Sequence, residues 1–248
     1  MVKLSARHFN LRYTLCHSSK THRKHERFLR DIASLNPDVL VHAGDWASNR
    51  QHQFYRSMLM FRNAVSCPIF AVRGNHDFWQ LRDKRSIRLS YEETLVNHLK
   101  CFKEIGIHHA DFGPLEIGGY SFYGFDGWYR TPNPPTNDEM HLPYTHEGLP
   151  IMELLTRKAY RDLSALIERL KGDRRKRVCV THFPPFSSSL IYRDLVANEN
   201  HLPIIEENFG VLMCGHSHLA SDWHYKGLRI INSGSDYDAP QLSCIDLD

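Results

Sequence analysis

Side chains that can bind metal ions or transfer protons follow four short apolar runs of the sequence. In chain order they are Asp45 after DVLVHAG, Asn75 and His76 after IFAVRG, His182 after VCVT, and His216 and His218 after VLMCG. Each residue alone is weak evidence, because a single aspartate often caps a helix and a single histidine is more often an ordinary surface or core residue. Four such clusters, each at the end of an apolar run, together indicate one shared metal site.

The residue types suit a site for two metal ions. Two ions about 3.5–4 Å apart need a bridging carboxylate, and Asp45 can offer one oxygen to each. Imidazole nitrogens bind transition metals, and the amide oxygen of Asn75 adds a ligand without adding charge. His216 and His218 are two residues apart, so in an extended chain both point to the same side. Glycines precede these ligands, where the backbone must turn sharply or approach closely: Gly44, Gly74 and Gly215.

The elements that must position these residues follow an alternating pattern. Helical patterns at 22–35, 51–64, about 91–105 and 153–171 alternate with short strand-like runs, the first of which is LRYTLCH at 11–17. The C-terminal part is strand-like throughout. This order predicts an α/β layered fold with mixed sheets, and ligands of such folds bind at the carboxyl ends of strands. The sequence has no internal repeat and no linker, so residues 1–248 are expected to form a single domain.

The overall composition is that of an ordinary globular protein, with 42% hydrophobic and 24% charged residues. A net charge of +3 is too small to indicate nucleic-acid binding by itself. No apolar run is long enough to span a membrane, and no signal peptide is recognisable at the N-terminus. The six cysteines include no C-x-x-C pair, and three of them lie in apolar runs. We therefore expect a cytoplasmic protein without a membrane partner.

The motifs together resemble those of the calcineurin-like metallophosphoesterase superfamily. The family pattern is D-x-H, G-D, G-N-H-[DE], a single H and G-H-x-H. The corresponding segments are Lys20-Thr21-His22, Gly44-Asp45, Gly74-Asn75-His76-Asp77, His182 and Gly215-His216-Ser217-His218. The resemblance spans most of the chain. It implies a four-layer α/β/β/α sandwich of two mixed sheets, with a dinuclear metal site between the sheet ends.

The resemblance also implies a role for each residue. The first metal would be held by position 20, His22, Asp45 and His218, and the second by Asp45, Asn75, His182 and His216. His76 would contact the phosphate and protonate the leaving oxygen, with Asp77 orienting it. A hydroxide bridging the metals would attack phosphorus in line. Arg73 is a further catalytic candidate that would help bind phosphate, although an arginine before that glycine is equally compatible with a surface position.

Lys20 is the one departure from the family pattern. An alternative alignment uses His17 and places Leu15 at the aspartate position, but His22 fits better. The run LCHSSKTH keeps the family's strand followed by S-D-x-H with only the aspartate changed. The spacing from His22 to Asp45 also leaves room for one helix and one strand. Lys20 therefore replaces a ligand of the first metal.

The electrostatic effect of Lys20 is large. Two unit charges 4 Å apart interact by about 4 kcal/mol at an effective dielectric of 20, so exchanging an anion for a cation beside a dication costs on the order of 10 kcal/mol. That is comparable with the apparent affinity of a good zinc site, about 10–16 kcal/mol. We expect an impaired or mononuclear site. Two other outcomes stay open: Lys20 swings outward or loses its proton, or the change is an inactivation that preserves the fold.

Two other features bear on the substrate. The segment 127–152 is rich in proline and turn residues, and we hypothesise that it forms a lid-like insertion. The aromatic residues Trp46, Phe78 and Trp79 directly follow metal motifs. Stacking on a nucleobase or sugar and simple packing are equally compatible with these positions. No substrate-binding residue can be named from the sequence.

The function indicated is a metal-dependent phosphoesterase, a hydrolase of the phosphoric-ester class (EC 3.1), with a phosphodiester favoured as substrate. The cofactor would be one or two divalent transition-metal ions, with manganese, iron and zinc all suited to an N/O site. The alternative is a catalytically weak or inactive member that acts as a binding or scaffold protein. A nuclease is the third hypothesis, disfavoured by the low net charge. The physiological substrate and the oligomeric state are left open.

Overall fold

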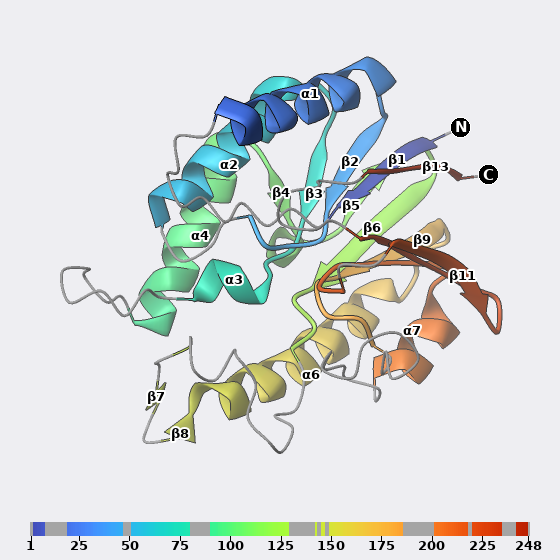
Figure 1. Cartoon of the computed structure of the whole chain (residues 1–248). Helices are drawn as coiled ribbons and strands as arrows, with labels where there is room; N and C mark the ends of the chain where they lie inside the picture. Colours follow the sequence, from blue (N-terminus) through green and yellow to red (C-terminus); the bar gives the residue numbers. More distant parts are fainter. Residues whose placement is uncertain are drawn as a thin grey trace.

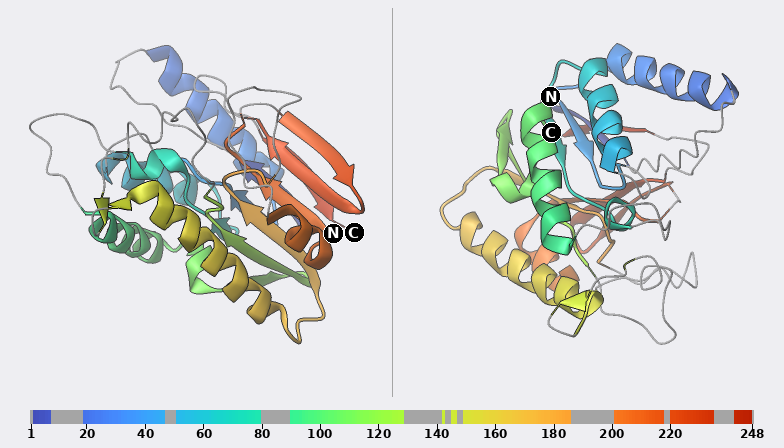
Figure 2. Two further views of the ribbon diagram at one scale, coloured as in Figure 1. Left: turned by 90° about the horizontal axis from the view of Figure 1, so that it is seen from below. Right: turned by 90° about the vertical axis from the view of Figure 1, so that its left-hand side faces the viewer.

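The structure is a computed structural model that describes residues 2–7, 19–46, 51–79, 90–128, 142, 145–146, 149–185, 201–217, 220–234 and 242–247. For residues 2–7, 19–25, 51–52, 145–146 and 149–150, only the backbone is described. Two β-sheets pack face to face, and helices cover the outer face of each (Figure 1). In the right-hand view of Figure 2, the two helical layers lie on opposite sides of the sheets.

The first sheet has the strand order β13-β1-β2-β3-β4. Its strands are β1 (Val2–Arg7), β2 (Val39–His42), β3 (Ile69–Ala71), β4 (His108–His109) and β13 (Ser243–Leu247). Strands β1 to β4 run parallel, and β13 pairs antiparallel with β1. The first and last strands of the chain therefore lie side by side (Figure 1).

The second sheet has the strand order β11-β12-β10-β9-β6-β5. Its strands are β5 (Leu115–Ile117), β6 (Tyr120–Phe125), β9 (Lys176–Thr181), β10 (Val211–Cys214), β11 (Ala220–Tyr225) and β12 (Leu228–Ser233). The four central strands run parallel, and the edge strands β5 and β11 are antiparallel to their neighbours. Both sheets are thus mixed.

The helices of the described residues lie between the strands in sequence. They are α1 (Ser19–Leu35), α2 (Gln51–Ala64), α3 (Asn75–Phe78), α4 (Tyr91–Ile105), the 3-10 helix η1 (Ala110–Phe112), α6 (Ile151–Leu170) and α7 (Leu202–Asn208). The small strands β7 (Thr145–His146) and β8 (Leu149–Pro150) form a separate two-stranded sheet. On α6, buried residues such as Leu155, Ala159 and Leu163 recur every four positions, which gives the helix one apolar face.

Three apolar layers hold the sandwich together. The layer between the sheets joins β2 and β3 to β6, β9 and β10, with Val41, Phe70 and Val180 among its buried residues. A second layer joins α1, α2 and α4 to the outer face of the first sheet. A third joins α6 and α7 to the outer face of the second sheet. The expected four-layer α/β/β/α sandwich is confirmed.

The helical predictions agree closely with the structure, and the structure adds a strand that the sequence patterns did not predict. The pattern at 22–35 lies within α1, those at 51–64 and 91–105 coincide with α2 and α4, and that at 153–171 corresponds to α6. The structure places its first strand at Val2–Arg7, whereas the expected strand 11–17 lies outside the described residues. Val2–Arg7 mixes apolar and basic residues, so no apolar run marks it. Backbone pairing with β2 and β13 on either side nevertheless makes it a strand.

The described cysteines are free thiols: Cys67, Cys101, Cys179, Cys214 and Cys244. Within the described ranges, no helix combines the length and the apolar character needed to cross a membrane. The cytoplasmic location and the single domain over 1–248 stay predictions.

Candidate metal centre

The clusters of polar residues predicted from the sequence follow the carboxyl ends of neighbouring strands. Asp45 follows β2, and Asn75 begins α3 after β3; these two strands are adjacent in the first sheet. His182 follows β9 and His216 follows β10, which are adjacent in the second sheet. The layer of apolar residues between the sheets holds these strands against one another. The topology therefore brings the polar residues of both sheets to one place.

Three of the predicted ligands meet in the interior. Nε2 of His182 lies 2.9 Å from Oδ1 of Asn75 and 3.6 Å from Oδ1 of Asp45. The side chains are almost fully buried, with exposed fractions of 0% for His182, 1% for Asp45 and 3% for Asn75. Residues from three strand ends thus present one nitrogen and two oxygens toward each other.

The hydrogen bonding of His182 suits a metal ligand. Its Nδ1 lies 2.7 Å from the carbonyl oxygen of Ala43, which can only accept, so Nδ1 carries the ring proton. In the neutral imidazole, Nε2 then presents a lone pair toward two acceptor oxygens, those of Asn75 and Asp45. A cation shared by these atoms relieves the unfavourable contact between lone pairs. Metal-bound histidines typically donate their other ring N–H in this way.

Two glycines allow the strand ends to approach this closely. A Cβ atom on Gly74 would lie 2.0 Å from Oδ1 of Asp45, and one on Gly44 would lie 2.7 Å from Nδ1 of His182. Gly44 also has a φ of +94°, in the region that favours glycine. Two of the three glycines predicted from the motif pattern, Gly44 and Gly74, are therefore required by the geometry of the site.

Two site residues adopt a left-handed backbone conformation that non-glycine residues rarely show. The φ values are 59° for Asp45 and 62° for His216. Such residues persist only where surrounding contacts hold them, and they cluster at functional sites. The N–H of Asp45 donates to Oδ2 of Asp77 over 3.1 Å, and Oδ1 of Asp45 accepts from the N–H of His76 over 3.0 Å. These bonds fix Asp45 in its unusual conformation.

His76, the predicted proton donor, lies beside the three ligands. Its Nε2 is 4.0 Å from Oδ2 of Asp45, and its ring stacks on Trp79 with 3.6 Å between centroids. Oδ2 of Asp77 accepts a second backbone hydrogen bond, from the N–H of Gly74 over 2.8 Å. The carboxylate of Asp77 thereby holds the backbone of the Gly74–Asp77 segment. Its predicted role in orienting His76 stays a prediction.

The sequence matches a known family over most of its length. The family model of calcineurin-like phosphoesterases matches residues 16–220. The chain belongs to this family. The match includes the segments that carry Asp45, Asn75, His182 and His216, so the centre described above lies within the matched region.

Solved structures of low sequence identity share the fold of this phosphoesterase. The crystal structure of phosphopantetheinyl hydrolase (PptH) from Mycobacterium tuberculosis aligns with a TM-score of 0.65 and 17% identity, over 98% of this chain and 96% of that one. A putative 5'-nucleotidase from Staphylococcus aureus aligns with a TM-score of 0.54 and 11% identity, over 98% of this chain and 53% of that one. No match to a curated protein is found. These likenesses establish the fold alone.

The remaining predicted ligands of the phosphoesterase are only partly described. The ring of His216 lies 5.2 Å from that of His182, centroid to centroid. His218 lies outside the described residues, and Lys20 and His22 belong to the first turn of α1, where only the backbone is described. Among the described side chains, no three of His, Cys, Asp or Glu form a group that could hold an ion. The three that meet include Asn75, which is not one of these types.

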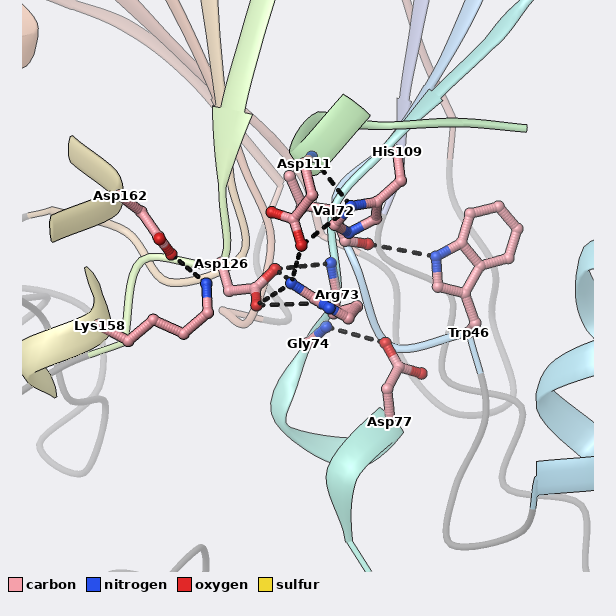
Figure 3. A network of polar contacts seen from close by, with 10 residues as sticks. All are labelled: Trp46, Val72, Arg73, Gly74, Asp77, His109, Asp111, Asp126, Lys158 and Asp162. Atoms are coloured by element: carbon pink, nitrogen blue, oxygen red, sulfur yellow. Dashed lines mark hydrogen bonds and ion pairs between the residues drawn. The ribbon is translucent and has the colours of Figure 1, made fainter. Parts of the chain in front are cut away.

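Arg73 lies in the interior and not on the surface. It is fully buried, and its guanidinium donates to Oδ2 of Asp126 over 3.1 Å and to Oδ2 of Asp111 over 2.8 Å (Figure 3). Burial acts to lower the pKa of Arg73, but the two carboxylates outweigh it and raise that pKa above its usual value. Burial acts to raise the pKa of Asp111, but Arg73 outweighs it and lowers that pKa to about 2. This arrangement favours a structural role for Arg73 over a phosphate contact.

The aromatic residues after the metal motifs pack in the interior. Trp46 is fully buried, stacks on His42 with 3.6 Å between centroids, and donates from Nε1 to the carbonyl oxygen of Val72. Phe78 is also fully buried, and Trp79 is 7% exposed. Of the two interpretations, packing is therefore the one that the structure favours.

Two residues near the centre were missed by sequence reasoning. Asn232 on β12 donates from Nδ2 to the carbonyl oxygen of Gly215 over 2.8 Å, and so supports the turn that carries His216. Asp126 follows β6 and contacts Arg73 with its carboxylate. The sequence could have indicated Asp126, because this residue follows an apolar strand as the other site residues do. Asn232 has no such signal, since it lies within a strand.

Proposed function

We propose that this phosphoesterase hydrolyses a phosphodiester with the help of bound divalent metal. The observation that carries the proposal is the convergence of His182 Nε2 with Oδ1 of Asn75 and Oδ1 of Asp45 in a buried position. One imidazole nitrogen, one amide oxygen and one carboxylate oxygen form an N/O donor set of the kind that manganese, iron and zinc accept.

The proposed ligand sets follow the family motifs. The second metal would be held by Asp45, Asn75, His182 and His216. The first would be held by His22, Asp45 and His218, and its remaining ligand position is occupied by Lys20. Bound divalent ions supply charge stabilisation to phosphoryl oxygens and activate water as the nucleophile. The second set is the stronger proposal, because three of its members already meet.

His76 is the proposed proton donor to the leaving oxygen. Its ring is held between the stacked indole of Trp79 and the carboxylate of Asp45, so its orientation is fixed before substrate arrives. A group held in place in this way needs no reorganisation during the reaction. The contact with Asp45 also couples the proton donor to the metal ligands.

Lys20 makes a mononuclear or impaired enzyme the expected form. The second candidate function is a catalytically weak family member that acts as a binding protein, and Lys20 is the residue that supports it. The intact second ligand set and His76 favour catalysis. Lys20 changes a ligand position of the first metal only, so the second metal loses no direct ligand.

The segment 127–152 is proposed as a lid over the site. Two described residues of the segment lie in the aromatic layer beside the metal centre: Trp128 and Leu142 are buried together with Phe78, Trp79 and Phe183. Trp79 and Phe183 in turn contact the rings of His76 and His216. The lid thus has a direct packing connection to the site.

Hydrolysis assays with a panel of substrates test the proposal. Chelator-treated protein would be reloaded with Mn²⁺ and offered bis-aryl phosphate, aryl phosphate, a cyclic nucleotide, a phosphopantetheinyl ester and single-stranded DNA. We expect a small-molecule diester to be cleaved faster than the monoester and than DNA, with activity lost on chelation and in Asp45→Asn. Folded, metal-loaded protein without activity on any ester would favour the binding protein. Preferential cleavage of DNA would favour the nuclease.

A further inference from the structure

The strands that end at the metal centre belong to different sheets, and a buried ion pair connects them. Arg73 immediately precedes the Gly74–Asp77 segment at the end of β3, whereas Asp126 follows β6 in the second sheet. Oδ1 of Asp126 accepts the backbone N–H of Arg73 over 3.1 Å, and Oδ2 accepts Nε–H over 3.1 Å. The exposed fractions are 0% for Arg73 and 3% for Asp126. Both carboxylate oxygens of Asp126 are therefore used to hold one residue of the opposite sheet.

The backbone of Asp126 holds the other half of the centre. Its carbonyl oxygen accepts the N–H of His182 over 3.3 Å and that of Phe183 over 3.4 Å. One residue thus contacts the chain on both sides of the proposed second metal. Its side chain contacts the residue two before Asn75, and its carbonyl contacts His182 itself.

Further charges surround this ion pair. Nη2 of Arg73 donates to Asp111, whose own N–H donates to Nδ1 of His109 over 3.1 Å (Figure 3). On α6, Lys158 and Asp162 form a neighbouring ion pair. The arginine is thus held at two carboxylates from two segments, and its position is fixed in more than one direction.

We infer that Asp126 is a positioning residue of the second metal site. It sets the distance between Asn75 and His182 through its hydrogen bonds to Arg73. This assignment rests on the proposed function. In this inference, Asp126 and Arg73 act without contacting the metal or the substrate themselves. Their effect is exerted on the ligands, whose spacing decides how well one ion fits between them.

Asp126→Asn is the direct test. It keeps the shape of the side chain and the carbonyl bond to His182, but it replaces one accepting oxygen with an NH₂ group that cannot accept from Arg73. Calorimetric titration of chelator-treated protein with Mn²⁺ measures the affinity directly. We expect a loss of about tenfold, the lower end of the range found when direct partners of metal ligands are removed, because the carboxylate acts on the ligands through Arg73. Thermal unfolding of the apo-protein is measured in parallel.

The control separates positioning from general destabilisation. Leu170→Ala truncates a buried residue at the end of α6, near the amino end of β9 and hence away from the carboxyl ends that carry the site. It should lower the unfolding temperature and leave Mn²⁺ affinity within about twofold of wild type, because single-site effects distant in space act independently. Asp126→Asn with wild-type Mn²⁺ affinity would overturn the inference.

Arg73→Lys provides a second, milder variant in case Asp126→Asn does not fold. Lysine keeps the charge beside Asp126 but cannot reach Asp126 and Asp111 together, as the planar guanidinium does. We expect a several-fold loss of Mn²⁺ affinity, and an unchanged affinity would contradict the inference. Wild-type protein that binds no Mn²⁺ would overturn the proposed function as well. Wild type that binds normally, with both variants unaffected, would overturn this inference alone.

Discussion

Nε2 of His182 lies 2.9 Å from Oδ1 of Asn75, although 107 residues separate them in the chain. The two residues belong to opposite sheets, and Asp45 contributes an oxygen 3.6 Å from the same nitrogen. In the neutral imidazole protonated at Nδ1, both Nε2 of His182 and Oδ1 of Asn75 offer lone pairs, which a shared cation would accept. This contact links the fold, which brings the strand ends together, to the chemistry proposed for the centre.

The close approach at Gly74 gives the sharpest test of the geometry. In Gly74→Ala, the new Cβ would lie 2.0 Å from Oδ1 of Asp45, so the carboxylate must move away from His182. We expect at least a tenfold loss of Mn²⁺ affinity, on the scale of about 1.4 kcal/mol or more. Gly210→Ala is the matched control, because a Cβ there meets no atom within 4 Å. Equal Mn²⁺ affinity in the two variants would argue against the site geometry.

Local signals predicted the α/β fold and placed polar residues at the strand ends, whereas the resemblance to the family implied the four layers and the proposed role of each residue. The apolar runs at Val39–His42 and Ile69–Ala71 are marked by composition, and the motif residues follow them directly. The strand Val2–Arg7 was missed, since its pairing with strands from both ends of the chain is non-local. The contact between Asp126 and Arg73 was missed for the same reason, because it joins residues 53 apart through tertiary packing.

A buried histidine makes stability depend on pH. His98 is 2% exposed and stacks on Phe54, and burial, reinforced by the charge of Arg73, lowers its pKa to about 3. In the unfolded chain a histidine takes up a proton below about pH 6.5. Between pH 6.5 and 3 the unfolded state therefore binds more protons, and stability falls as pH falls, by up to about 1.4 kcal/mol per pH unit.

His98→Phe removes this contribution while keeping an aromatic ring against Phe54. Urea unfolding at a series of pH values should show a shallower loss of stability below pH 6.5 than in wild type. His224→Phe, at an exposed position on β11, is the control and should leave the slope unchanged. A slope in His98→Phe as steep as that of wild type would refute the neutral, buried state of His98.

Restoring the family aspartate at position 20 tests the expected mononuclear site. Lys20→Asp removes a cation and supplies a ligand, a change of several kcal/mol beside a dication. We expect bis-aryl phosphate hydrolysis to rise at least about tenfold, and the bound Mn²⁺ to rise toward two ions per chain. Lys20→Ala removes only the cation and should give a smaller gain. Unchanged activity and metal content in Lys20→Asp would show that position 20 is not a ligand position.

The proposed lid is tested by replacing residues 129–141 with a short Gly/Ser linker. The buried anchors Trp128 and Leu142 remain, so the aromatic layer beside the centre is kept. We expect the ratio of kcat/KM between a large and a small diester to change by about tenfold or more, since lids complete the substrate site. Mn²⁺ affinity should stay the same. An unchanged ratio of kcat/KM between the two diesters would contradict the proposal that this segment is a lid.

Anomalous diffraction from crystals equilibrated with Mn²⁺ would locate the metal directly. We expect a manganese peak within bonding distance of Nε2 of His182 and the Oδ1 atoms of Asn75 and Asp45. We expect a weaker peak, or none, at the position beside Lys20. Saturated crystals without a peak at His182 would contradict the metal centre itself, and two peaks of full occupancy would contradict the impairment by Lys20.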